Sequence, residues 1–140
     1  MEVLNLAKSY DFFKPETCRE RIHIIGCGSV GSTVAELLTR FGLTKLTLYD
    51  FDIVEPQNLA NQIYTQGHVE VQKVDALETI LSEINPEITD ILKLERYGYK
   101  NQRLSGYVFL CVDNIDLRRE IATANKDNPY IRQCSISAPA

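Results

Sequence analysis

The feature that most constrains the fold is a glycine-rich segment from Gly26 to Gly31 with the spacing G-x-G-x-x-G. It follows a β-rich run, residues 21–25, and precedes residues 30–41, whose apolar side chains recur at helical spacing. In this context Gly26 permits a tight turn, Gly28 lets the backbone approach a phosphate, and Gly31 lets the helix pack close to the sheet. Backbone amides at the helix start, from Ser29 onward, favour an anion. The segment therefore predicts a nucleotide-binding loop, which fits NAD, FAD and ATP equally well.

A second run typical of a strand, residues 45–49, ends at Asp50. An acidic side chain at the end of the second strand accepts hydrogen bonds from ribose hydroxyls in dinucleotide-binding folds. The glycine loop and Asp50 are therefore in the order that a nucleotide site requires.

The rest of the chain continues to alternate strand and helix. Apolar periodicity predicts further strands at 88–94, 107–112 and 130–135, helices at 71–84 and 115–125, and a short helix at 4–13. This alternation is typical of an α/β fold with a doubly wound, mostly parallel sheet and helices on both faces. We expect a Rossmann-like order, 3-2-1-4-5, in one domain spanning residues 1–140.

Composition excludes several classes of protein. A net charge of −4 disfavours a nucleic-acid or anionic-membrane binder, and no apolar run is long enough to span a bilayer. The four cysteines form no C-x-x-C pair, so spacing predicts no zinc site and four reduced thiols. His23 lies in a run predicted to be a strand and is expected to be a packed or edge residue. His68 lies in a predicted loop and is expected to be solvated. We expect a cytoplasmic protein.

The segment after Asp50 carries more specific motifs. It continues as Asp50-Phe51-Asp52-Ile53-Val54 and then Asn58-Leu59-Ala60-Asn61-Gln62, followed by Lys73, Ile84-Asn85-Pro86 and Asp113-Asn114. In order and spacing, residues 21–119 resemble the ThiF/MoeB superfamily, the adenylylating domain of ubiquitin-activating enzymes and their bacterial relatives.

The resemblance implies a role for each matched position. Gly26, Gly28 and Gly31 match the phosphate-side loop, and Asp50 matches the acid that holds the ATP ribose. Asp52 matches a second acid of the same turn, and Asn58 matches the asparagine of the N-L-x-R-Q motif. Lys73 matches the lysine that contacts ATP phosphates, and Asp113 matches the aspartate that supports the catalytic magnesium. The resemblance makes Lys73 and Asp113 the candidate catalytic residues.

The implied reaction is ATP-dependent adenylylation of the C-terminal carboxylate of a ubiquitin-like or sulfur-carrier protein, which gives an acyl adenylate and pyrophosphate. ATP and Mg²⁺ are the implied cofactors, and a homodimer is the family-like assembly. Loops after the first and fourth strands of a parallel sheet open at the same carboxyl edge, so Gly28 and Asp113 are expected to face one crevice.

Two departures from the family pattern keep alternatives open. Asn61 stands where the family has an arginine, and asparagine cannot neutralise phosphate charge. The motif order also leads us to expect that the chain is the N-terminal part of a larger ThiF-type domain, in which case the strand from Tyr130 onward should expose an apolar edge or face. The alternatives are a nucleotide-binding scaffold without catalysis and an NAD- or FAD-dependent oxidoreductase domain.

Overall fold

The sheet of the computed structural model, which describes residues 18–88, 90–95 and 103–136, has five parallel strands in the order β3-β2-β1-β4-β5. The strands are β1 (Ile22–Ile25), β2 (Lys45–Tyr49), β3 (Asp90–Leu94), β4 (Gly106–Leu110) and β5 (Ile131–Ile136). Both the doubly wound α/β class and the strand order expected from the sequence are confirmed.

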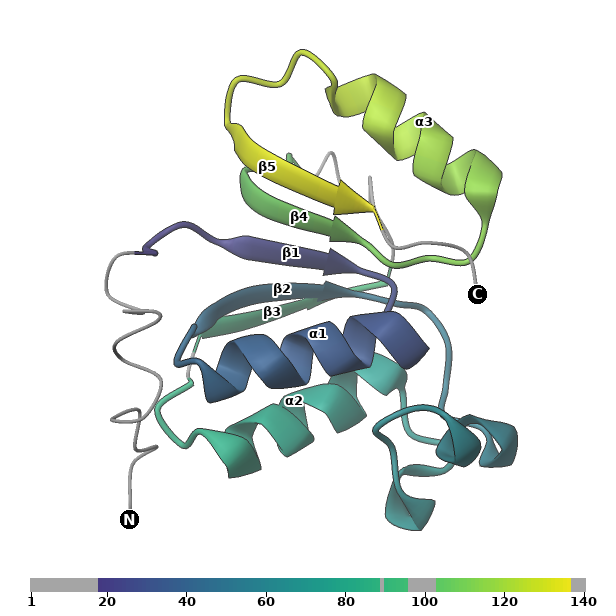
Figure 1. Cartoon of the computed structure of the whole chain (residues 1–140). Coiled ribbons are helices and arrows are strands. Elements are labelled where there is room, and N and C mark those ends of the chain that lie inside the picture. The colour runs from purple at the N-terminus through teal and green to yellow at the C-terminus, as the bar shows by residue number, and fades with distance from the viewer. Residues whose placement is uncertain (1–17, 89, 96–102, 137–140) are drawn as a thin grey trace.

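Helices cover both faces of this sheet. α1 (Ser29–Arg40) and α2 (Lys73–Ile84) lie on one face, and α3 (Ile115–Asn125) lies on the other, over β4 and β5 (Figure 1). Two short 3-10 helices, η2 (Pro56–Ala60) and η3 (Gln66–His68), lie in the long connection from β2 to α2. The helix expected at 4–13 lies outside the described residues.

The core has two layers because side chains of the buried central strand alternate between the two faces. Ile22 and Ile24 pack with α1 and α2, whereas Ile25 packs in the second cluster, with Ile121 of α3. Every residue of β1 is buried. This central position places the end of β1, and the glycine loop that follows it, at the middle of the sheet's carboxyl edge.

The apolar positions of α1 that recur at helical spacing do not all face the core. Val34 and Leu38 pack against it, whereas Val30, Leu37 and Phe41 are 41%, 51% and 40% exposed. The fully buried residues of the helix are small, namely Gly31, Ser32, Ala35 and Thr39. Small side chains fit here because the glycine loop brings the start of α1 close to the sheet.

The edge of the sheet at β5 partly matches its expectation. β5 is the last strand in the order, and Tyr130 just before it is 67% exposed. Over Ile131 to Cys134, the part of the strand whose side chains are described, the exposed ones are Arg132, Gln133 and Cys134, so this stretch of the edge is less apolar than expected. All four cysteines are free, as expected. Within the described residues, no helix has both the length and the apolar character needed to cross a membrane.

His23 is a packed residue of the central strand, not an edge residue. Its side chain is buried, and Nδ1 lies 2.7 Å from the hydroxyl of Tyr49, whereas Nε2 has no partner among the described residues. Burial, helped by the positive charge of Arg21, lowers the pKa of His23 from 6.5 to about 4. His23 is therefore neutral in the folded protein near pH 7.

We predict that stability falls as the pH drops from 7 to 5. Between pH 6.5 and about 4 the unfolded chain binds a proton at His23 that the folded chain does not. The stability is therefore present above pH 6.5 and is lost as the pH falls toward 4, by about 2 kcal/mol at pH 5. Urea unfolding at both pH values measures this slope. The variant His23→Gln should lose most of it, and an unchanged slope in the variant would contradict the assignment.

Candidate functional site

Two glycines of the glycine loop occupy positions where no side chain fits, and a third, Gly28, has uncrowded surroundings. Gly26 has φ +99°, and a Cβ there would lie 2.8 Å from the backbone of Cys111 and Val112; a Cβ on Gly31 would lie 1.7 Å from the carbonyl oxygen of Gly26. At Gly28, in contrast, the nearest atom is a side-chain nitrogen of Gln62 at 3.6 Å. The fold therefore requires Gly26 and Gly31, whereas Gly28 leaves open space above the loop.

Asp50 ties the glycine loop to the loop after β2. Its Oδ2 accepts a hydrogen bond from the amide of Cys27 at 2.8 Å, and its Oδ1 accepts one from the amide of Asp52 at 2.8 Å. The residue is partly exposed. Each carboxylate oxygen has a second lone pair, so these contacts orient Asp50 and still leave acceptors for a ribose hydroxyl.

The connection between β2 and α2 folds back toward this loop. Asn58 caps η2, because its Oδ1 accepts a hydrogen bond from the amide of Glu55 at 2.8 Å. Asn61 follows η2 and is exposed. The carbonyl of Asp52 accepts a hydrogen bond from the amide of Lys73 at 2.9 Å, which fixes the start of α2 beside the acidic turn.

Lys73 is the most unusual group at the site. It is 7% exposed, and its ammonium makes no hydrogen bond or ion pair with any residue that the structure describes. Burial raises the pKa of the neighbouring Cys27 thiol, the Asp50 carboxylate raises it further, and the Lys73 charge opposes this rise. Both charges therefore act on the glycine loop. The stem of this side chain is covered, and its Nζ is not among the buried polar atoms that lack a partner. A cation beside the loop, with no anionic partner among the described residues, suits a bound phosphate.

Two further residues shape the loop, and neither was expected in the site from the sequence. The side-chain nitrogen of Gln62 would lie 3.6 Å from a Cβ at Gly28, and the Oε1 of Gln62 is buried with no partner among the described residues. Tyr64 is 3% exposed, and its hydroxyl donates a hydrogen bond to the carbonyl of Cys27 at 2.6 Å. Gln62 belongs to the motif that also contains Asn58, which is a signal that could have found it. No sequence pattern pointed to the hydroxyl of Tyr64.

The end of β4 lies next to the glycine loop. The amide of Cys111 donates a hydrogen bond to the carbonyl of Ile25 at 2.7 Å, so the segment leading to Asp113 starts where β1 ends. Asp113 is exposed, and Asn114 caps α3 by accepting a hydrogen bond from the amide of Leu117 at 3.0 Å. The two strand ends meet as expected, whereas the facing of Gly28 and Asp113 stays a prediction.

Arg118 corrects an expectation. Adjacent charged residues such as Arg118 and Arg119 on a predicted helix indicate a solvated face, but Arg118 is buried and its Nε donates a hydrogen bond to the carbonyl of Val112 at 2.5 Å. Only Arg119 is exposed. Helical position alone hid this contact, because it depends on how the turn between β4 and α3 folds over the helix. Arg118 thus holds the backbone next to Asp113.

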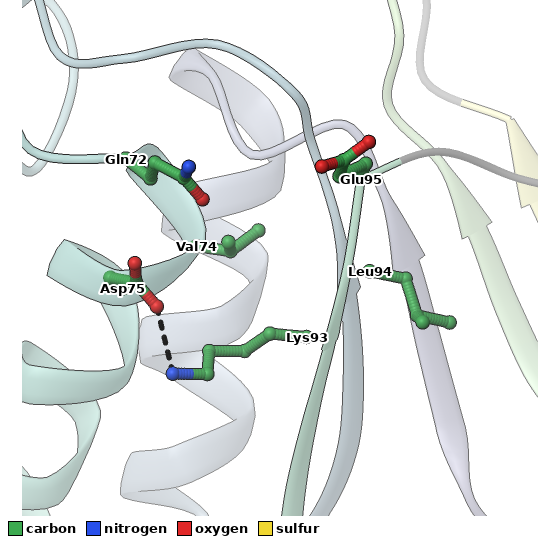
Figure 2. A pocket seen from close by; sticks show the side chains of 6 residues that line it. All are labelled: Gln72, Val74, Asp75, Lys93, Leu94 and Glu95. Atoms are coloured by element: carbon green, nitrogen blue, oxygen red, sulfur yellow. Dashed lines mark hydrogen bonds and ion pairs between the residues drawn. The ribbon is translucent and has the colours of Figure 1, made fainter. Parts of the chain in front are cut away.

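A pocket of about 320 Å³ lies between the start of α2 and the end of β3 (Figure 2). Its lining residues are Gln72, Val74, Asp75, Lys93, Leu94 and Glu95. Inside it the Lys93 ammonium contacts Asp75 Oδ1 at 2.7 Å and Glu78 Oε1 at 3.0 Å. Lys73, which lies between two of the lining residues in the sequence, does not line the pocket. The pocket is thus a neighbour of the candidate site, and its lysine already has anionic partners.

Comparison with known proteins gives both the family and the fold. The ThiF family profile matches residues 16–132. Ubiquitin-like modifier-activating enzyme 5 of Gallus gallus is 34% identical over 138 residues, which cover 86% of this chain and 34% of that protein. The same enzyme of Xenopus laevis is 36% identical over 120 residues, covering 74% of this chain and 30% of that protein. The chain spans about a third of the length of these curated relatives.

Solved structures with the same fold include E. coli tRNA N6-threonylcarbamoyladenosine dehydratase in complex with ATP. The TM-score is 0.78 at 21% identity, and the match covers 94% of this chain and 56% of that one. E. coli MccB with AMPCPP and MccA gives a TM-score of 0.69 at 21% identity, over 76% of this chain and 34% of that one. At this identity the likeness concerns the fold. Because the family profile covers most of the sequence, and because relatives above 30% identity cover more than two thirds of it, the chain belongs to the ThiF family.

Proposed function

We propose that this chain binds ATP with Mg²⁺ and forms the nucleotide side of a site that adenylylates the C-terminal carboxylate of a ubiquitin-like or sulfur-carrier protein. The observation that carries the proposal is Lys73, whose side chain is largely buried, whose ammonium has no anionic partner among the described residues, and whose charge acts on the same loop as Asp50. Membership of the ThiF family and the resemblance to ubiquitin-like modifier-activating enzymes support the reaction class. The proposed location is the cytoplasm, and a homodimer is the proposed assembly.

The reaction needs alignment and charge rather than a protein nucleophile. A carboxylate oxygen of the carrier forms a bond to the α-phosphorus, and the bond from that phosphorus to the oxygen bridging to the β-phosphate breaks, so pyrophosphate leaves. Lys73 supplies a positive charge on a side chain whose stem is held by packing, so the charge is in place for the phosphates before the reaction. Gly28 and Ser29 offer amides at the start of α1, and Asp50 is oriented toward the ribose.

The residues present also fit a magnesium ion held jointly with the nucleotide. Within the described residues, no group of three or more histidine, cysteine, aspartate or glutamate side chains gathers around one point. Mg²⁺ commonly uses only one or two carboxylates plus substrate phosphates, and the exposed Asp113 provides one such carboxylate. When bound, the ion neutralises charge on the leaving pyrophosphate.

The magnesium assignment predicts a specific loss. In the wild-type protein, adding Mg²⁺ should tighten the binding of ATP, as measured by calorimetric titration with and without EDTA. In Asp113→Asn this difference should disappear, because the amide cannot replace a charged ligand, while the metal-free affinity stays unchanged. Asp116→Asn, which changes an exposed acid in the first turn of α3, is the matched control. A variant that keeps the full response to Mg²⁺ would rule out Asp113 as the ligand.

The proposed reaction is tested by exchange of labelled pyrophosphate into ATP in the presence of Mg²⁺ and a candidate carrier. Exchange that depends on the carrier, and on its C-terminal glycine, is the expected result. Displacement of bound ATP by NAD, with no effect of Mg²⁺, would instead favour the oxidoreductase reading. An NAD affinity far below that of ATP would remove that reading.

A second candidate function is nucleotide binding without turnover. It is favoured by Asn61, which is exposed after η2 and carries no charge where the resemblance implies an arginine. Under this reading ATP binds but no carrier supports exchange. The variant Asn61→Arg decides between the two: a gain of exchange without a change in fold identifies a lost catalytic cation.

A further inference from the structure

Tyr64 fixes the orientation of the peptide group between Cys27 and Gly28 in the glycine loop. The carbonyl oxygen of Cys27 accepts the hydrogen bond from the Tyr64 hydroxyl at 2.6 Å, and this contact is buried. The amide of the same peptide unit belongs to Gly28. Because a trans peptide is planar, its carbonyl and its amide point in opposite directions. A hydrogen bond that holds the Cys27 carbonyl inward therefore turns the Gly28 amide outward.

The outward amide has the properties of a phosphate donor. The Gly28 amide donates to no acceptor among the described residues. The carbonyl of Gly28, which belongs to the next peptide unit, accepts a hydrogen bond from the amide of Ser32 at 3.0 Å in the first turn of α1. A Cβ at Gly28 would have only the Gln62 side chain within 4 Å, so the surroundings of this residue are uncrowded. An unpartnered amide at a helix start, with open space above it, suits an anionic oxygen.

The other side of the Cys27 residue is also fixed. Its amide donates to Asp50 Oδ2 at 2.8 Å, and the preceding Gly26 amide donates to the carbonyl of Tyr49 at 2.8 Å. Tyr64 and Asp50 thus hold Cys27 from its two ends. Burial, together with the nearby Cys27 and Asp50, raises the pKa of the Tyr64 hydroxyl, so Tyr64 remains a donor.

We propose that Tyr64 is a positioning residue for nucleotide phosphate: its hydroxyl holds the Cys27 carbonyl so that the Gly28 amide points at the phosphate. This inference rests on the proposed function, since it assumes that a nucleotide occupies the glycine loop. It adds a residue that acts through the backbone rather than by touching the ligand. Its effect should therefore depend on the presence of phosphates in the ligand.

The test is Tyr64→Phe, which keeps the buried ring and removes only the hydroxyl. ATP should bind about tenfold more weakly, which corresponds to the loss of one buried hydrogen bond that orients a donor. Adenosine, which has no phosphate, should bind the variant and the wild type equally. Calorimetric titration, or competition at millimolar adenosine, measures both affinities. Tyr130→Phe removes an exposed hydroxyl and is the matched control, with no change expected.

Two other outcomes contradict the positioning role of Tyr64, and a third contradicts the proposed function. Equal ATP affinity in Tyr64→Phe and wild type overturns the positioning role. An equal loss for ATP and adenosine also overturns it, because it marks general damage to the site. If the wild-type chain binds ATP no better than adenosine, the proposed function itself fails. Amide NMR of the wild type keeps the inference testable if the variant is unfolded: ATP must shift the Gly28 amide resonance more than adenosine does.

Discussion

Replacing Gly31 by alanine is expected to unfold or severely destabilise the protein. A Cβ at this position would lie 1.7 Å from the carbonyl oxygen of Gly26 and 2.8 Å from its carbonyl carbon. These are backbone atoms of a loop that is held on both sides, so neither can swing away as a side chain would. Helix α1 has to move off the sheet instead, and it loses the contacts of its small buried face. The expected cost is on the order of 4 kcal/mol, in the range of the most damaging single substitutions.

Two other glycines provide matched controls for this prediction. Gly67→Ala adds a Cβ that meets nothing within 4 Å, and Gly28→Ala adds one that meets only a flexible side-chain end at 3.6 Å. Both variants should remain folded, with unfolding free energies within about 1 kcal/mol of wild type. Urea unfolding of all three variants gives the comparison. A Gly31→Ala protein as stable as the Gly67→Ala protein would show that α1 does not pack against the loop in this way.

The topology could be predicted from the sequence because it depends on local patterns. Short β-rich runs alternate with helical periodicity, and Gly26 to Gly31 join the first strand to the first helix at a fixed distance. The burial of α1 could not be predicted in the same way. Periodicity identifies apolar positions such as Leu37, but the close approach imposed by Gly31 decides which side of the helix faces the sheet.

The candidate site shows the same division between pattern and packing. Motif order pointed to Asp50 and Lys73, and the structure brings both charges to the glycine loop. The sequence could not indicate that the Lys73 side chain is largely covered with no anionic partner among the described residues, because that depends on how the connection after β2 folds back. It also could not indicate the contact between Tyr64 and Cys27, which are 37 residues apart. Hydrogen bonds from side chains to distant backbone groups leave no periodic signal.

Replacing Lys73 by methionine is expected to stabilise the folded protein and to weaken ATP binding. Methionine keeps the buried part of the side chain and removes a charge that has no partner among the described residues, so its partial desolvation no longer opposes folding. The unfolding free energy should rise by about 1 kcal/mol, as is common where a functional residue is kept at the expense of stability. The affinity for ATP should fall roughly a hundredfold, because a charge contact with phosphate is lost.

The opposite signs of the two effects make the Lys73 prediction specific. Urea unfolding without nucleotide measures stability, and calorimetric titration with ATP measures affinity. Lys45→Met, at an exposed lysine at the start of β2, is the control and should change neither quantity much. A lysine that serves the fold would give a less stable Lys73→Met protein, and a lysine that serves neither purpose would leave ATP affinity unchanged. AMP, which lacks the β- and γ-phosphates, should lose less affinity than ATP if Lys73 contacts the outer phosphates, and a loss equal to that of ATP would place the contact at the α-phosphate.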